Sequence, residues 1–214
     1  MLDTSPRAAV DIAGDVMPEA VSRALSRFRH GPGAFAVHFA VEGGIPWTHL
    51  PSREAGTVHV GGSFEETAVA EREIHRGAMP EKPFVLVTQQ SVADPTRARG
   101  GVHPVDTYAH VPVGFTGDAT AAIIARIEEY APGFRDRIVA KTVWNVRHIE
   151  DANPNYIEGD IVTGANSRAN CCSARGSPST RTAQGRAVST CVPQPPRRVP
   201  EPTACAVTTR HCPR

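Results

Sequence analysis

The sequence predicts an α+β domain, because two long strand patterns occur among helix-like stretches and between direct strand-to-strand steps. Residues 34–42 alternate apolar and small or polar side chains, as a strand with one buried face does. Residues 105–113 alternate in the same way and place Asp106, Tyr108 and His110 on a shared face. Since strands and helices alternate along the body, an α/β arrangement is the alternative to α+β.

The other expected elements follow in order along the chain. Further strands are expected at 57–60, 84–87 and 138–146, and helices at 18–29, at 64–76 and after Asp118. Ser63 and Glu66 have the spacing of a capping box for the helix at 64–76. Residues 1–13 are expected to form a short lead-in, with a turn at 3–6. Several direct β-β steps argue against a purely parallel sheet.

Charge and composition divide the chain near residue 170. The formal net charge is +1, but residues 171–214 hold seven arginines and a single acidic residue, Glu201, so residues 1–170 are about −5. An acidic body gives no reason to expect nucleic acid as a partner. The tail lacks Leu, Ile, Phe, Met, Trp and Tyr and contains seven prolines. Such a segment cannot bury enough apolar surface to fold, and we expect 169–214 to be disordered.

Location follows from two absences in the sequence. No run of 18 apolar residues is present, so no membrane span is expected. The first residues, MLDTSPRAAVDIAGD, lack the basic and apolar regions of a signal peptide. The expected location is cytoplasmic.

Motifs for metal or thiol chemistry are weak. The nine histidines match no ligand motif, although His49 and His59 flank a loop, and His103 and His110 could meet at one strand end. A metal-dependent hydrolase is therefore a weaker alternative, and no metal ligand is assigned. All five cysteines lie in the tail, which argues against a nucleophilic thiol or a disulfide framework.

Two further features have a functional and a structural interpretation. Gly61-Gly62, before the helix at 64–76, could leave a helix N-terminus open to a phosphate or could simply be a turn. Four aromatic or imidazole side chains could line an apolar pocket, or could be ordinary core and sheet-surface residues: Trp47, Tyr108, His110 and Trp144.

Several stretches, in this order, carry a family resemblance: a VLDTSP-like opening (here MLDTSP), RFRHGPGAFAVHFAVEGGIPW, AGTVHVGGSFEETAVAE, PFVLVTQQSVADPTRA, YAHVPVG, IEEYAPGFRDRI and NPNYIEGDI. Together they resemble the C-terminal half of the phytoene desaturase-like NAD(P)/FAD-dependent oxidoreductases. The resemblance covers about residues 1–168. No single stretch is a chemical signature, and the ordered set carries the resemblance.

The resemblance implies a two-domain, Rossmann-type flavoprotein in which a substrate domain is inserted into an FAD domain. Residues 1–12 would leave the FAD domain, 13–146 would form the substrate domain, whose sheet covers the flavin, and 147–168 would return toward the FAD domain. The resemblance places Tyr156, Gly159 and Asp160 on the flavin side and makes Tyr108 and His110 the expected substrate residues. Glu158 stands where the family usually has glycine.

Two family segments are not found in the chain. The GxGxxG fingerprint that seats the FAD pyrophosphate would lie upstream of Met1. The glycine-rich segment that closes over the flavin should follow residue 168. A shifted reading frame would explain the second absence: codons for 188–211 permit VYLCSAATPPGAGAHGMCGYHAA in another frame, and those for 168–173 permit RQLLL. The hypothesis is that 169–214 is translated off frame, and an early stop codon in the shifted frame would refute it.

The expected function is thus that of a partial FAD-dependent oxidoreductase, whose parent enzyme transfers hydride from an apolar or otherwise unidentified small-molecule substrate to FAD. We expect this chain alone to bind FAD weakly or not at all and to be inactive. The alternative is a non-enzymatic α+β module, or a subunit that pairs with a separately encoded FAD-binding half. No catalytic acid or base is assigned.

Overall fold

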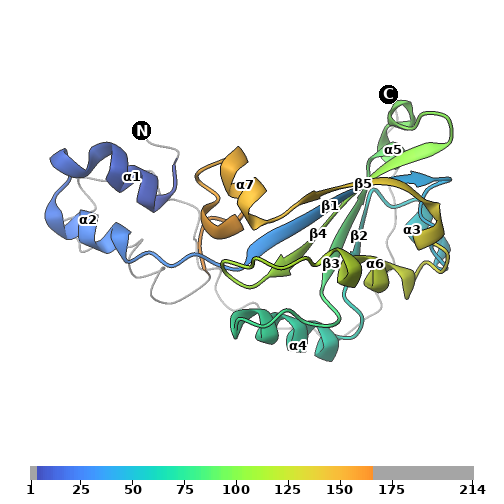
Figure 1. Cartoon of the computed structure of the whole chain (residues 1–214), viewed down its shortest axis with the longest axis horizontal. Helices are drawn as coiled ribbons and strands as arrows, with labels where there is room; N and C mark the ends of the chain where they lie inside the picture. The colour runs from blue at the N-terminus through green and yellow to red at the C-terminus, as the bar shows by residue number, and fades with distance from the viewer. Residues whose placement is uncertain (1–3, 166–214) are drawn as a thin grey trace, which may run out of the picture.

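A five-stranded antiparallel sheet forms the centre of the computed structural model, which describes residues 4–165 (Figure 1). Its strands lie in the order β2-β3-β4-β1-β5, and every pairing is antiparallel. The strands are β1 Gly33–Glu42, β2 Thr57–Val60, β3 Val85–Gln89, β4 Val102–Val111 and β5 Ile138–Trp144. Helices accompany the sheet, so the mixed α+β class and the exclusion of a purely parallel sheet are confirmed.

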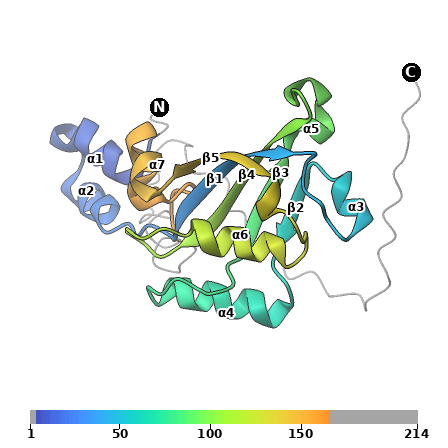
Figure 2. The ribbon, with the colours of Figure 1, turned by 45° about the vertical axis from the view of Figure 1, so that its right-hand side comes forward.

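Helices gather at both ends of the sheet and on one of its faces. They are α1 Pro6–Ala13, α2 Glu19–Ser26, α3 Leu50–Arg53, α4 Phe64–His75, α5 Gln90–Ala93, α6 Thr120–Glu128 and α7 Val146–Ala152. Four short 3₁₀ turns complete the fold: η1 Gly14–Val16, η2 Pro95–Arg97, η3 Arg135–Arg137 and η4 Ile157–Gly159. Helices α1, α2 and α7 lie at one end of the sheet and α3 and α5 at the other (Figures 1 and 2).

One face of the sheet, called here the covered face, packs against α6. The expected alternation of 34–42 is confirmed, because Phe35, Val37, Phe39 and Val41 are all buried. They form one apolar cluster with Ile123 and Ile127 of α6 and with Phe134, whose ring meets that of Phe39 edge to face at 5.4 Å. Burial of this alternating set fixes which face of β1 points inward.

The capping box at the start of α4 is also confirmed. The Ser63 hydroxyl accepts a hydrogen bond from the Glu66 backbone N–H (3.1 Å), and the Glu66 carboxylate accepts one from the Ser63 N–H (2.8 Å). These two bonds satisfy backbone donors that an α-helix leaves unpaired at its N-terminus.

Two expectations about chain ends and element boundaries are wrong. Residues 6–13 are helical rather than part of a short lead-in, because Ser5 accepts from the Ala8 N–H (3.3 Å) and Pro6 occupies the first turn. The strand expected to run to Val146 ends at Trp144, because the Asn145 side chain accepts from the His148 N–H (3.0 Å) and starts α7. Both predictions are wrong for the same reason: the N-cap residues, Ser5 and Asn145, also suit a turn or the end of a strand.

The N-terminal segment and the segment after β5 meet where β1 begins; we call this meeting point the junction, formed by residues 4–33 and 146–165. The Ser5 N–H donates to Asn155 Oδ1 (2.8 Å), and the Ala165 N–H donates to the Arg29 carbonyl (3.0 Å). The chain therefore enters and leaves the sheet at the same end. The disorder and the shifted frame expected for 169–214, with all five cysteines, lie outside the described residues.

Candidate functional site

The candidate site begins on the sheet face opposite α6, called here the open face. Strand β4 places Asp106, Tyr108 and His110 on this face, as predicted, because its alternate residues Val105 and Thr107 are buried. The Tyr108 and His110 rings lie next to each other, with centroids 6.2 Å apart and a tilt of 39°. The two expected substrate residues are therefore neighbours on one half-buried surface.

A second histidine joins this surface from β1. His38 pairs with Asp106 in the strand register, and its Nδ1 donates to Asp106 Oδ1 at 2.7 Å. The Gln90 side chain donates to the other oxygen of the same carboxylate. Trp144 of β5 meets the His38 ring edge to face at 5.9 Å and keeps 42% of its surface exposed. The carboxylate and the indole together hold the imidazole in one orientation.

The open face leads into a cavity of about 890 Å³ at the junction, called here the junction cavity. His110 lies at its edge, where its Nδ1 donates to Glu71 Oε1 of α4 at 3.0 Å. The cavity has several titratable side chains in its walls, among them His30, Glu71, His75, His110, Glu158 and Asp160. The structure thus brings one expected substrate residue, His110, and one expected flavin-side residue, Asp160, into the walls of one cavity.

Asp160 is fully engaged by the protein itself. Its side chain is buried, with 1% exposed, and Oδ2 accepts from the Gly31 N–H (2.7 Å) while Oδ1 accepts from the Val162 N–H (3.0 Å). His30 Nδ1 lies 3.6 Å from Oδ2. These contacts tie the segment after β5 to the segment before β1, so Asp160 has a clear structural role at the junction.

The other two expected flavin-side residues lie beside the cavity, outside its lining. Gly159 is buried with φ of 78°, and a Cβ there would come within 3.1 Å of Val146. Tyr156 is half-buried, and its backbone N–H donates to the Asn153 carbonyl (2.9 Å). Glu158 adopts φ of 55°, a conformation that glycine takes without strain. The positive φ means that glycine would fit position 158 without strain.

Two proposed groupings of side chains do not form. Trp47 does not share a pocket with Tyr108, His110 and Trp144, because it is buried in the core on the covered face and its indole N–H donates to Gln89 Oε1 (3.0 Å). His103 and His110 do not converge, because they lie near opposite ends of the ten-residue strand β4. Sequence periodicity gives the face of a strand residue but not the face reached by a loop residue such as Trp47.

Gly61-Gly62 does not offer an open helix N-terminus, because Glu66 of the capping box already lies against it. The buried Arg126 guanidinium lies nearby, with Nη1 2.5 Å from Glu129 Oε2 and Nη2 3.8 Å from Glu66 Oε2. The Ser63 N–H and Arg126 thus face carboxylates of the same chain, and the Glu66 N–H is taken up by the Ser63 hydroxyl. Elsewhere in residues 4–165, no three His, Cys, Asp or Glu side chains gather as a metal ion would require.

The open face presents two oriented imidazoles at a partly exposed surface. Two imidazoles, His38 and His110, are each held by a carboxylate, which fixes the nitrogen that carries the proton. The alternation predicted for 34–42 is consistent with the face of His38, but no sequence pattern predicted its pairing with Asp106 or the contacts of Glu71 and Gln90. Strand register and the packing of α4 create these pairs, and neither is encoded in a local pattern.

Comparison of the chain with protein-family models and with curated protein sequences gives no match. Within residues 4–165, each helix is too short or too polar to cross a lipid bilayer.

Proposed function

We propose that the chain is the substrate domain of an FAD-dependent oxidoreductase of the phytoene desaturase-like type, with its open sheet face turned toward flavin and substrate. The observation that carries the proposal is the open face itself. It aligns Tyr108, His110, His38 and Trp144 on one half-buried surface, while the opposite face is closed by α6. A sheet that covers a cofactor needs this asymmetry.

The path of the chain supports an inserted domain. Ser5 binds Asn155, and the Gly31 N–H donates to Asp160, so the segments before β1 and after β5 lie side by side. A domain inserted into another must leave its host and return to it at neighbouring points. The junction provides two such points.

We expect FAD binding to need a second polypeptide, because candidate groups among the described residues are already engaged within the chain. Both oxygens of Asp160 accept hydrogen bonds from the chain, and the helix N-terminus after Gly61-Gly62 is capped by Glu66. In this family the FAD accepts hydride from the substrate, while the protein binds and orients both. We therefore assign Tyr108 and His110 to substrate contact and Asp160 to positioning of the return segment, and we expect the chain alone to be inactive.

A second candidate function is a non-enzymatic partner module that uses the same open face. Trp144, 42% exposed beside His38, is the observation that favours an interaction surface, because exposed tryptophan is enriched in interfaces. The two candidates differ in whether flavin is present in the assembly.

Co-expression with the upstream gene tests the proposal. We expect a tag on this chain to recover a polypeptide that contains GxGxxG, and the complex to show the visible absorbance of oxidised flavin, whereas the chain alone is colourless. A colourless complex would favour the partner-module function. Absence of any upstream frame with GxGxxG would contradict a split flavoprotein, and the nucleotide sequence after codon 168 would test the shifted frame separately.

A further inference from the structure

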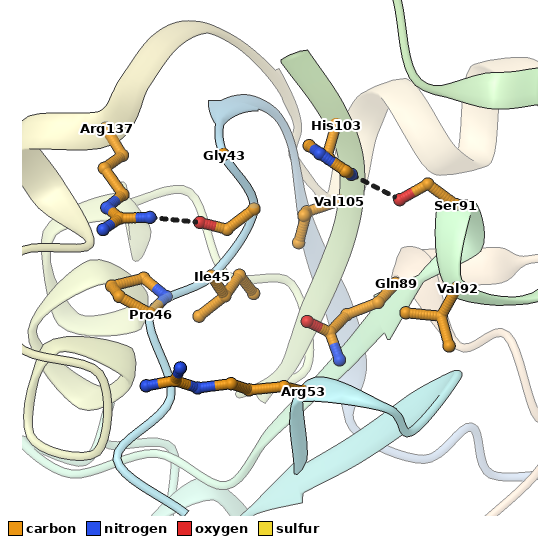
Figure 3. A pocket seen from close by; sticks show the side chains of 11 residues that line it. Gly43, Ile45, Pro46, Arg53, Gln89, Ser91, Val92, His103, Val105 and Arg137 are labelled. Atoms are coloured by element: carbon orange, nitrogen blue, oxygen red, sulfur yellow. Dashed lines mark hydrogen bonds between the residues drawn. The ribbon is translucent and has the colours of Figure 1, made fainter. Parts of the chain in front are cut away.

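A second cavity lies at the end of the sheet remote from the junction. It has a volume of about 250 Å³ and is called here the distal cavity. Strands β1 and β4 each contain ten residues, so the two cavities are separated by about 30 Å of strand. The Gly43-Gly44 turn after β1, the start of β4, α3, α5 and η3 contribute to its walls (Figure 3). The distal cavity is therefore a separate site from the junction cavity and from the proposed flavin face.

Its polar lining is cationic. Arg53 from α3, Arg137 from η3 and His103 from β4 all line the cavity, and no Asp or Glu does so. Neither arginine forms an ion pair with an acidic side chain in residues 4–165. Figure 3 shows the two guanidinium groups on the same side of the cavity, with Pro46 between them. Two unpaired guanidinium groups at one cavity create a positive potential that favours an anion.

Backbone carbonyls hold both arginines in place. Arg53 Nε donates to the Trp47 carbonyl at 2.7 Å, and Arg137 Nη1 donates to the Gly44 carbonyl at 3.4 Å. Each guanidinium has five N–H donors, so one bond to a carbonyl leaves the others for a ligand. Gly43 has φ of 65°, and a Cβ there would come within 3.2 Å of Arg137 Nη1. Glycine at this turn therefore leaves room for the arginine.

The rest of the cavity lining is fixed and partly apolar. Gln89 is buried and makes three side-chain hydrogen bonds, to Trp47, Ser52 and Ala55, so it holds α3 against β3. Ser91 and His103 are hydrogen-bonded to each other at 2.9 Å, as Figure 3 shows. The apolar part of the lining is Ile45, Pro46, Val92 and Val105.

We propose that the distal cavity binds the carboxylate of a small aliphatic acid. The two guanidinium groups would donate to the carboxylate oxygens, and the short apolar chain would lie against Ile45, Val92 and Val105. The volume suits a ligand of a few carbon atoms, below the range of drug-sized sites. Binding is favoured over nucleophilic catalysis by Ser91, because in residues 4–165 no carboxylate orients the second nitrogen of His103.

The test uses the full chain and three probes: butyrate, acetate and the neutral butyramide, all at constant ionic strength. NMR signals of the arginine Nε–H groups and of the His103 ring report occupancy. We expect saturable shifts at Arg53, Arg137 and His103 with butyrate, weaker binding of acetate because it lacks the apolar chain, and no saturation with butyramide. Equal response to butyrate and butyramide would overturn the proposal.

Two variants and a matched control make the test specific. Arg53→Gln and Arg137→Gln should each weaken butyrate binding by about tenfold or more, because each removes a charge-assisted donor. Arg135→Gln lies in the same 3₁₀ turn as Arg137 but outside the cavity lining and should leave binding unchanged. An equal loss in Arg135→Gln and Arg137→Gln would show a general charge effect and contradict the site. Amide spectra of β1 and β4 that match the unsubstituted chain show that each variant is folded.

Discussion

The two faces of the same sheet differ in what their side chains do. On the covered face, Phe39 and Val105 are buried in an apolar cluster with α6, and each contributes through packing. On the open face, Asp106 and His38 pair with each other, and Trp144 remains 42% exposed. One strand alternation therefore produces a buried, stabilising surface and a surface whose side chains stay partly exposed, and substitutions on the two faces should have different consequences.

The largest expected effect is on the covered face. Phe39→Ala should lower the free energy of unfolding by about 3–5 kcal/mol, because it removes a buried ring and leaves a cavity against Phe134. Tyr108→Ala on the open face should lower it by about 1 kcal/mol or less, since its ring is only half-buried. Denaturant unfolding of both variants measures the difference. Equal losses would show that the open face is part of the core.

A smaller effect is expected from the buried amide of Gln89. Gln89→Leu should cost roughly 2 kcal/mol, because the Trp47 indole N–H and the Ser52 and Ala55 carbonyls lose their partner. Gln90→Leu is the matched control: it removes an amide that bonds Asp106 on the open face, where water can replace it. Thermal unfolding should show a clearly lower melting temperature for Gln89→Leu and little change for Gln90→Leu. A larger decrease for Gln90→Leu would contradict the assignment of Gln89 to the covered face and Gln90 to the open face.

A stabilising change is expected at the junction. Glu158→Gly should raise the free energy of unfolding by up to about 1 kcal/mol, because glycine adopts φ of 55° without the strain of a side chain. Glu150→Gly, within helix α7, is the control and should instead destabilise by about 1 kcal/mol. The denaturant concentration at the unfolding midpoint should rise for Glu158→Gly and fall for Glu150→Gly. Destabilisation by Glu158→Gly would show that its side chain contributes more than its backbone conformation costs.

The smallest effect is a pH dependence at the start of α4. The hydrogen bond from the Ser63 backbone N–H, aided by Arg126 and Lys82, lowers the pKa of Glu66 below its ordinary value of 4.5. Because the folded-state pKa is the lower one, the ionised carboxylate stabilises the fold above pH 4.5, and this contribution is lost as the pH falls through the folded-state pKa. Glu66→Gln should flatten this acid part of the stability curve. If the pH dependence of stability is the same in Glu66→Gln as in the unsubstituted chain, Glu66 is not the group responsible for it.

The sequence predicted those features that depend on local patterns. The alternation of Phe35 to Val41 gave the face of β1, and Ser63 with Glu66 gave the start of α4. It failed where one residue suits two local structures, as Ser5 does before α1. It could not supply the partners of Asp106, since His38 reaches it through strand register and Gln90 through the chain reversal after β3. Local periodicity describes a strand, whereas tertiary packing decides which strands and loops meet.

The accessibility of Trp144 tests most directly whether the open face covers a flavin. Acrylamide quenching should find Trp144 accessible in the chain alone, and its contribution should disappear in Trp144→Phe, leaving only the buried Trp47. In the complex with a flavin-binding polypeptide, we expect Trp144 to be shielded from acrylamide and its emission to be quenched by the flavin. Trp144 emission and accessibility that are the same in the complex as in the chain alone would contradict a flavin-covering role for this face.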